Sequence, residues 1–151
     1  MKLVYSLREE LNRNPKRIAD TQALTLDASR PFGLKGTYGL FGSPEWWRNI
    51  ETGVAPVKVL TGKITKLYRE GMHNEGQGFE IALGDGTPYT YSCVANDKKD
   101  IRAYQVGKLV EITMVFDPFK KPMQGSGGQT ESHSRVVLTV SLSEQPSGGM
   151  A

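Results

Sequence analysis

The sequence predicts a mainly β domain preceded by a helical and glycine-rich segment. Apolar residues recur at helical spacing before Pro56, whereas from Val57 onward they alternate with polar residues, which is the period of a strand. Asp85-Gly86 between two alternating runs is a strong hairpin signal. A chain of 151 residues suits one hydrophobic core. We therefore expect an extension over residues 1–56 that packs on or extends from the β domain, the β domain over 57–143 and a flexible tail over 144–151.

Composition excludes several classes of protein. Hydrophobic residues at 38 % and charged residues at 23 % are near globular averages, which argues against a disordered or fibrous chain. The sequence contains no apolar run long enough to span a membrane and no secretory signal, so we expect a cytoplasmic protein without membrane contact. Cys93, His73 and His133 are too few for a disulfide scaffold or a zinc site, and we expect no metal and no cofactor.

Two short helices are expected near the amino terminus. Ser6 and Glu9 have capping-box spacing, and the apolar stripe behind them stops at Asn14. Pro15 suits the first turn of a second helix, whose partial apolar face continues to Leu26.

A glycine-rich stretch and a third helix follow. Glycine recurs at every third position from Gly33 to Gly42, and because Lys35 precedes the next glycine, the order of a phosphate-binding loop is absent. We expect an extended arm lying on the β domain. Ser43 then caps a helix that carries Trp46 and Trp47. Adjacent helical residues diverge by about 100°, so core packing and a role as interface anchors both remain open for these two side chains.

Five strands and one short helix are expected in the β domain. The first strand is long and bent, with a bulge near Gly62. The hairpin and a short helix follow it, and a long mobile loop separates the last two strands. The expected strands are 56–71, 78–84, 87–95, 108–116 and 134–144, the helix is 96–105, and the loop is 117–133.

Three phrases in this order resemble the OB-fold superfamily: GKIT in the first strand, FEIALGDGTPYTY in the hairpin and VGKLVEITMVF in the fourth strand. The resemblance covers residues 57–143 and implies a five-stranded Greek-key barrel, with the short helix between its third and fourth strands. Small OB-fold proteins bind single-stranded nucleic acid by stacking bases on aromatic rings and neutralising phosphates with cations. A net charge of +3 is compatible with that partner.

The resemblance directs attention to basic side chains that lie beside aromatic ones. Such candidates for nucleic-acid binding occur late in the first strand, in the third strand and in the long loop. They are Lys63, Lys66, Tyr68, Arg69, Tyr89, Tyr91, Phe119, Lys120 and Lys121. A solvated strand face is the alternative for the first four, and Phe119 could simply anchor its loop.

The length of the hairpin loop decides where the two tyrosines point. A two-residue loop pairs Tyr89 with Ala82 and Tyr91 with Glu80, so that both rings face outward. A three-residue loop pairs them instead with Ile81 and Phe79, so that both rings join the core. The sequence leaves both registers open.

The function expected from this sequence is binding, not catalysis. No serine lies in a nucleophile elbow or triad motif, and no histidine has an evident partner for acid–base chemistry. The leading hypothesis is a bacterial protein that binds single-stranded DNA or RNA with little sequence preference, as an accessory to DNA replication or repair. The alternative is a protein-binding adaptor or self-assembling module that docks a partner or a second copy through Trp46 and Trp47 of the extension.

Overall fold

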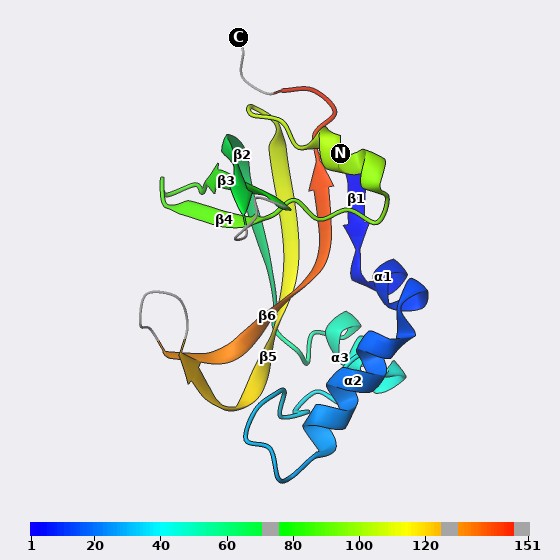
Figure 1. Cartoon of the computed structure of the whole chain (residues 1–151). Helices are drawn as coiled ribbons and strands as arrows, with labels where there is room; N and C mark the ends of the chain where they lie inside the picture. The colour runs from blue at the N-terminus through cyan, green and yellow to red at the C-terminus, as the bar shows by residue number, and fades with distance from the viewer. Residues whose placement is uncertain (71–75, 125–129, 147–151) are drawn as a thin grey trace. The chain divides into compact units, whose positions relative to one another are not determined.

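The computed structural model describes residues 1–70, 76–124 and 130–146, and Figure 1 shows the order of its elements. The described residues form two compact units, each made of separate stretches of the chain. Unit 1 comprises Met1–Glu9, Val59–Thr113 and Leu138–Ala151, and unit 2 comprises Glu10–Lys58 and Met114–Val137. In chain order the elements are β1 (Lys2–Ser6), α1 (Leu7–Arg13), α2 (Pro15–Leu26), α3 (Pro44–Glu51), β2 (Val57–Glu70), β3 (Gly76–Ala82), β4 (Pro88–Ser92), the 3-10 helix η1 (Lys98–Ala103), β5 (Leu109–Gln124) and β6 (Thr130–Leu142).

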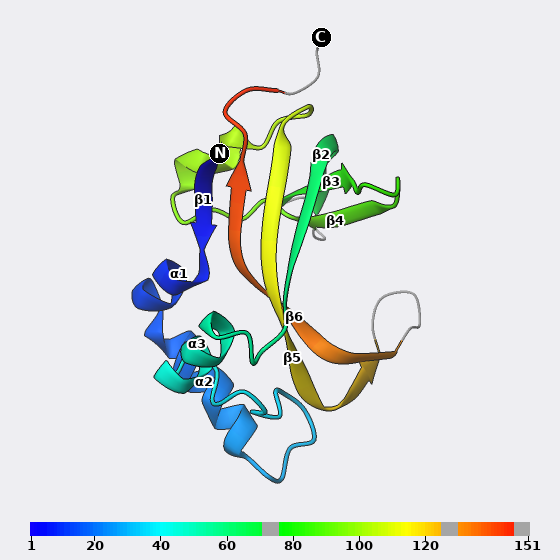
Figure 2. The ribbon, with the colours of Figure 1, turned by 180° about the vertical axis from the view of Figure 1, so that it is seen from behind.

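Unit 1 is organised around a six-stranded sheet in the order β1-β6-β5-β2-β3-β4 (Figures 1 and 2). The mainly β class is therefore confirmed, and η1 lies between β4 and β5 where a short helix was expected. The five-stranded barrel is not what the structure shows. β1 and β4 are the two edge strands of this sheet, and no strand pair within the described residues joins them to close a barrel.

The strand β1 was not expected from the sequence. It is only five residues long and runs directly into the helix that Ser6 introduces, so its alternation is too short to separate from the helical pattern. β1 pairs antiparallel with the end of β6, where Lys2 lies opposite Leu142. Val4 and Tyr5 are buried as a result.

The outer edge of β1 is closed by a side chain. The carboxamide of Asn96 accepts a hydrogen bond from the backbone N–H of Ser6 at 2.7 Å and donates one to the backbone carbonyl of Ser6 at 3.1 Å. The backbone N–H of Asn96 also donates to the carbonyl of Val4 at 3.0 Å. Asn96 thus pairs with the edge as a further strand would, and satisfies backbone groups that partial burial removes from water.

The register of β2, β3 and β4 resolves the question of the hairpin. Phe79 lies opposite Tyr91 and Ile81 opposite Tyr89, which is the register of the three-residue loop. The backbone N–H of Leu83 donates to the carbonyl of Thr87, so the loop spans the three residues between them. Both tyrosines are half-buried on the face that carries the buried Phe79 and Ile81.

The core of unit 1 is apolar and includes one deeply placed phenol. The ring of Tyr104 stacks on Phe79 at a centroid distance of 5.1 Å, and its hydroxyl donates to the carbonyl of Val94 at 2.6 Å. Burial raises the pKa of Tyr104, so the side chain remains a neutral donor at physiological pH. Cys93 is also buried, as expected of a small packed residue.

Unit 2 contains α2, α3 and the end of α1, which are helices predicted from the sequence. α1 and α2 follow each other at Asn14-Pro15, and the hydroxyl of Ser43 accepts from the backbone N–H of Trp46 at 3.2 Å to cap α3. The glycines at every third position from Gly33 to Gly42 all have positive φ, which explains their spacing because other residues rarely adopt that conformation. The arm that they form lies against β5, where Leu34 bridges to Phe119.

The long loop predicted over 117–133 is wrong for most of its length. β5 continues to Gln124 and β6 begins at Thr130, and residues 125–129 lie outside the described residues. Pro118 is tolerated within β5 because the bridge to the arm uses only its carbonyl, which accepts from the N–H of Lys35 at 2.9 Å.

Within the described residues, no helix is both long enough and apolar enough to cross a membrane.

Replacing Asn96 with alanine is expected to destabilise unit 1 by about 1–3 kcal/mol, because the backbone N–H and carbonyl of Ser6 both lose their partner. Urea unfolding followed by far-ultraviolet circular dichroism measures the change. The matched control is Lys99→Ala at an exposed position, which is expected to shift stability by less than about 0.5 kcal/mol. Equal effects of the two substitutions would contradict the role of Asn96.

Candidate functional site

One face of the sheet in unit 1 is open and polar. Lys66 lies opposite Glu80, Tyr68 opposite Gly78 and Lys63 opposite Ala82, so these side chains share the face that points away from Phe79 and Ile81. Both lysines are exposed, and Tyr68 is half-buried. Cations and an aromatic ring are thus held side by side on paired strands, which fixes their spacing better than a loop would.

A β-bulge brings the two lysines onto the same face. Positions three apart on a regular strand point to opposite faces, as Lys63 and Lys66 would. The register shifts between Ile64 and Lys66, leaving Thr65 as the extra residue. The bulge predicted in this strand is confirmed, three residues beyond Gly62. The hydroxyl of Thr65 donates to the backbone carbonyl of Glu80 at 3.2 Å and anchors the bulge to β3.

The ring of Tyr68 lies over Gly78. A β-carbon at Gly78 would come within 2.5 Å of the ring, so only glycine leaves room for this placement. A hollow of about 280 Å³ is lined by Leu67, Tyr68, Arg69 and Gln77. Arg69 is exposed but lies opposite Gln77, on the other face from Lys66 and Tyr68. The structure therefore brings together three of the four candidates predicted in this strand.

Tyr89 and Tyr91 do not form an outward platform with these residues. They share the face of Phe79, and the ring of Tyr91 meets that of Phe79 edge-on at a centroid distance of 6.5 Å. The two-residue register that would have turned both tyrosines outward is wrong. Thr90, between them, is exposed on the face of Glu80.

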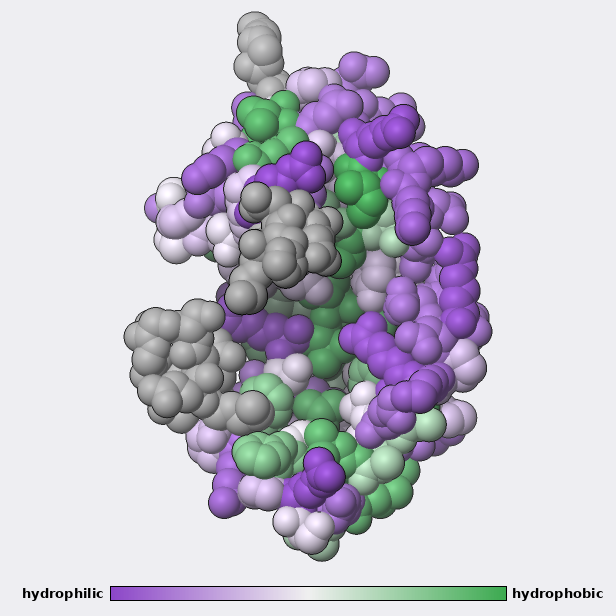
Figure 3. Space-filling view, viewed as in Figure 1, coloured by the Kyte–Doolittle hydropathy of each residue, from purple (hydrophilic) through white to green (hydrophobic). Residues whose placement is uncertain are grey.

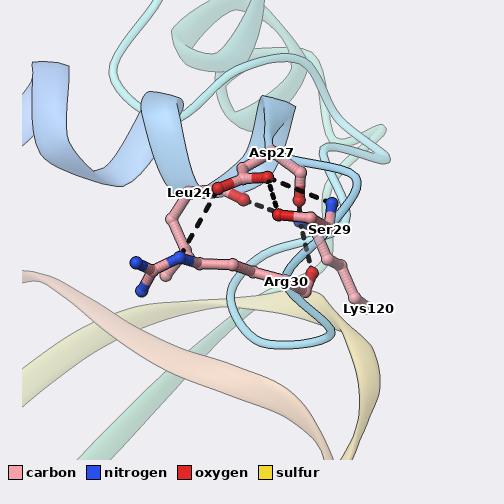
Figure 4. A network of polar contacts seen from close by, with 5 residues as sticks. All are labelled: Leu24, Asp27, Ser29, Arg30 and Lys120. Carbon is pink, nitrogen blue, oxygen red and sulfur yellow. Dashed lines mark hydrogen bonds and ion pairs between the residues drawn. The ribbon is translucent and has the colours of Figure 1, made fainter.

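Lys120, in unit 2, binds the end of a helix. Its ammonium group donates to the backbone carbonyls of Leu24 at 2.6 Å, Asp27 at 3.0 Å and Arg30 at 3.1 Å (Figure 4). These carbonyls come from the last turn of α2 and the segment after it, where orphan acceptors and the helix dipole favour a cation. The ammonium group predicted to contact phosphate is thus fully engaged with the protein itself.

Asp27 organises the segment around that cation. Its carboxylate accepts from the hydroxyl of Ser29 at 2.6 Å and from the backbone N–H of Ser29 at 3.0 Å, and it pairs with Arg30 at 3.5 Å (Figure 4). The bond from the Ser29 hydroxyl is the main reason why the pKa of Asp27 is lowered. Phe119 is half-buried next to Lys120 and bridges to the arm, whereas Lys121 is exposed.

A buried carboxylate fixes α3 within unit 2. The indole N–H of Trp46 donates to Asp117 at 2.9 Å, and Asp117 is 1 % exposed. The other carboxylate oxygen of Asp117 has no hydrogen-bond partner among the described residues, and burial raises the pKa of this group. Trp46 is fully buried, packing against Phe41 at a centroid distance of 5.0 Å, so the hypothesis that it anchors a partner is wrong. Trp47 is half-buried beside it.

The surface over α2 is largely hydrophilic in Figure 3, in keeping with a helix none of whose residues is buried.

His73 lies outside the described residues, and His133 is exposed on β6. No group of three or more metal-ligating side chains occurs in the parts of the chain that the structure describes.

The described residues define a mainly β protein with a polar sheet face in unit 1 and a helical unit held by buried polar contacts. A family model described as Immunity protein RhsI2 matches residues 1–143. Because this match covers most of the chain, the protein belongs to the RhsI2 immunity protein family. No curated protein matches the chain.

Family membership corrects the reading of the sequence. The resemblance to OB-fold nucleic-acid-binding proteins is wrong, and with it the expectation of single-strand binding and of a role in DNA replication. The strand order that suggested the barrel is real, but β1 lies beside β6 and extends the sheet at that edge. The alternative hypothesis of a protein-binding module agrees better with the family.

Replacing Lys120 with methionine keeps the apolar stem and removes three charged hydrogen bonds, so unit 2 is expected to lose about 1–3 kcal/mol of stability. Tryptophan fluorescence during urea unfolding reports on unit 2, because both tryptophans of the chain belong to it. Lys121→Met is the matched control, at the exposed neighbouring position, and is expected to be nearly neutral. If Lys120→Met left the stability of unit 2 unchanged, the three hydrogen bonds from Lys120 would contribute nothing to it.

Replacing Asp117 with asparagine is expected to change how stability depends on pH. The pKa of Asp117 is raised by folding above its ordinary 3.8, so the folded state holds the proton more tightly. The stability that this group contributes to the wild type therefore falls as the pH rises from the unfolded-state pKa to the raised folded-state pKa. Asparagine keeps an acceptor for Trp46 and has no such loss. Melting temperatures from pH 3.5 to 7.5 should show the variant gaining on the wild type as pH rises. Glu111→Gln, at an exposed carboxylate, serves as the control, and a constant difference for Asp117→Asn would refute the argument.

Proposed function

We propose that this protein binds an Rhs toxin protein directly and neutralises it as its cognate immunity protein. The observation that carries the proposal is the match of the immunity protein family over residues 1–143, which extends over residues of both units. The toxin is the protein partner that such a function requires.

The surface of unit 1 supports inhibition by binding. Unit 1 offers the open polar face of β2 and β3, which carries Lys63, Lys66 and Tyr68. A rigid sheet surface of this kind suits a preorganised complex that forms without large rearrangement.

Isothermal titration calorimetry with the purified toxin domain tests the proposal. We expect a one-to-one complex with a Kd of about 10⁻⁸ M or tighter, because an inhibitor must occupy nearly all of its target at cellular concentrations. Co-expression should restore growth to cells that produce the toxin. An Rhs toxin domain from a different toxin–immunity pair is the control for specificity and should show no binding.

Two results would contradict the proposal. One is the absence of a complex between the wild-type protein and the toxin at micromolar concentrations. The other is protection from the toxin without any complex, because an enzymatic reversal of toxin damage needs no stable contact between the two proteins.

A further inference from the structure

The face of β2 and β3 carries two exposed cations, Lys63 and Lys66. Neither lysine forms an ion pair within residues 1–70, 76–124 and 130–146, and both are exposed. Glu80 is the acidic residue opposite Lys66, but one of its carboxylate oxygens lies 3.4 Å from the hydroxyl of Thr65 and no bond to Lys66 is formed. The two ammonium groups are therefore available to a ligand.

These lysines differ from cations that serve the fold. Lys120 is bound by three backbone carbonyls, Lys2 pairs with Asp100 at 2.9 Å, and Lys16 pairs with Asp20 at 2.9 Å. On β2, the bulge turns Lys63 and Lys66 to one side, and Gly78 makes room for the ring of Tyr68 beside them. Tyrosine is enriched in protein interfaces, and the two exposed cations beside this ring attract an acidic partner.

We propose that this face, formed by Lys63, Lys66 and Tyr68, is the part of the protein that receives an acidic surface of the toxin. The inference rests on the proposed function and adds to it the location of the contact and the charge of the partner. Carboxylates on the toxin pair with the two ammonium groups, and the ring of Tyr68 covers apolar atoms between them. The excess of positive charge, +3 for the whole chain, favours the same encounter at long range.

The bulge gives the contact its geometry. It places two lysines on one face of one strand, and both backbones are held by the pairing of β2 with β3. The ammonium groups therefore start from a fixed platform, and less conformational entropy is lost on binding than for lysines on a loop. Arg69 points to the opposite face, so it is not part of this contact.

The test is the double charge reversal K63E/K66E in the full-length protein, with binding to the toxin domain measured by surface plasmon resonance at several salt concentrations. We expect the Kd to rise by about tenfold or more, mainly through a slower association rate, and the dependence of that rate on salt to weaken. The control is K98E/K99E, which makes the same change of charge at exposed positions on η1 of the same unit. It should alter the Kd by less than about threefold.

The outcomes separate the two proposals. A K63E/K66E variant that melts like the wild type and binds the toxin equally well would overturn the docking face and leave the proposed function intact. Equal weakening by both double variants would also overturn it, because the effect would then follow total charge and not this face. Failure of the wild-type protein to bind the toxin would refute the proposed function itself. If K63E/K66E fails to fold, K63Q/K66Q under the same measurements decides the question, with a smaller expected loss of about threefold to tenfold.

Discussion

The register between β2, β3 and β4 is the constraint on which unit 1 depends. Side chains on a strand alternate between two faces, so a shift of one residue would exchange every buried residue of β3 for an exposed one. The observed register buries Phe79 and Ile81 and leaves Glu80 on the open face. The three-residue hairpin loop sets the pairing of β3 with β4, and the bulge in β2 adjusts the pairing of β3 with β2. The core and the candidate binding face are consequences of the same register.

Unit 2 obtains its order from polar contacts as well as from apolar packing. Trp46 is fully buried and yet requires a partner for its indole N–H, which Asp117 provides. α2 has no fully buried residue, and Lys120 holds its end through backbone carbonyls. These contacts join segments that lie 71 and 96 residues apart in the sequence. Cations and aromatic rings in this unit thus have structural roles.

Basic and aromatic residues therefore have different roles in the two units. Phe119, Lys120 and Lys121 form the most suggestive basic and aromatic cluster in the sequence, but Lys120 is engaged by carbonyls and Phe119 contacts the arm. Lys63 and Lys66 look like an ordinary solvated strand, but the bulge gathers them on one face with Tyr68. Family membership then replaces nucleic acid with a protein as the expected partner of such a face. Basic patches with aromatic rings suit either class of macromolecule, so composition alone does not separate them.

Local chemistry was sufficient to predict the helices, the hairpin and the presence of a bulge. Ser43 caps α3 through its own hydroxyl, and Pro15 begins α2, because such signals act within one turn of chain. β1, the extension of β5 through Pro118 and the faces of Tyr89 and Tyr91 were decided only by the tertiary structure. β1 depends on β6, and the extension of β5 through Pro118 depends on the glycine arm, both of which are distant in sequence. The faces of the tyrosines depend on the length of the adjacent hairpin loop, which the sequence left open. Strand pairing is a contact between remote segments, and no local pattern of residues specifies which segments meet.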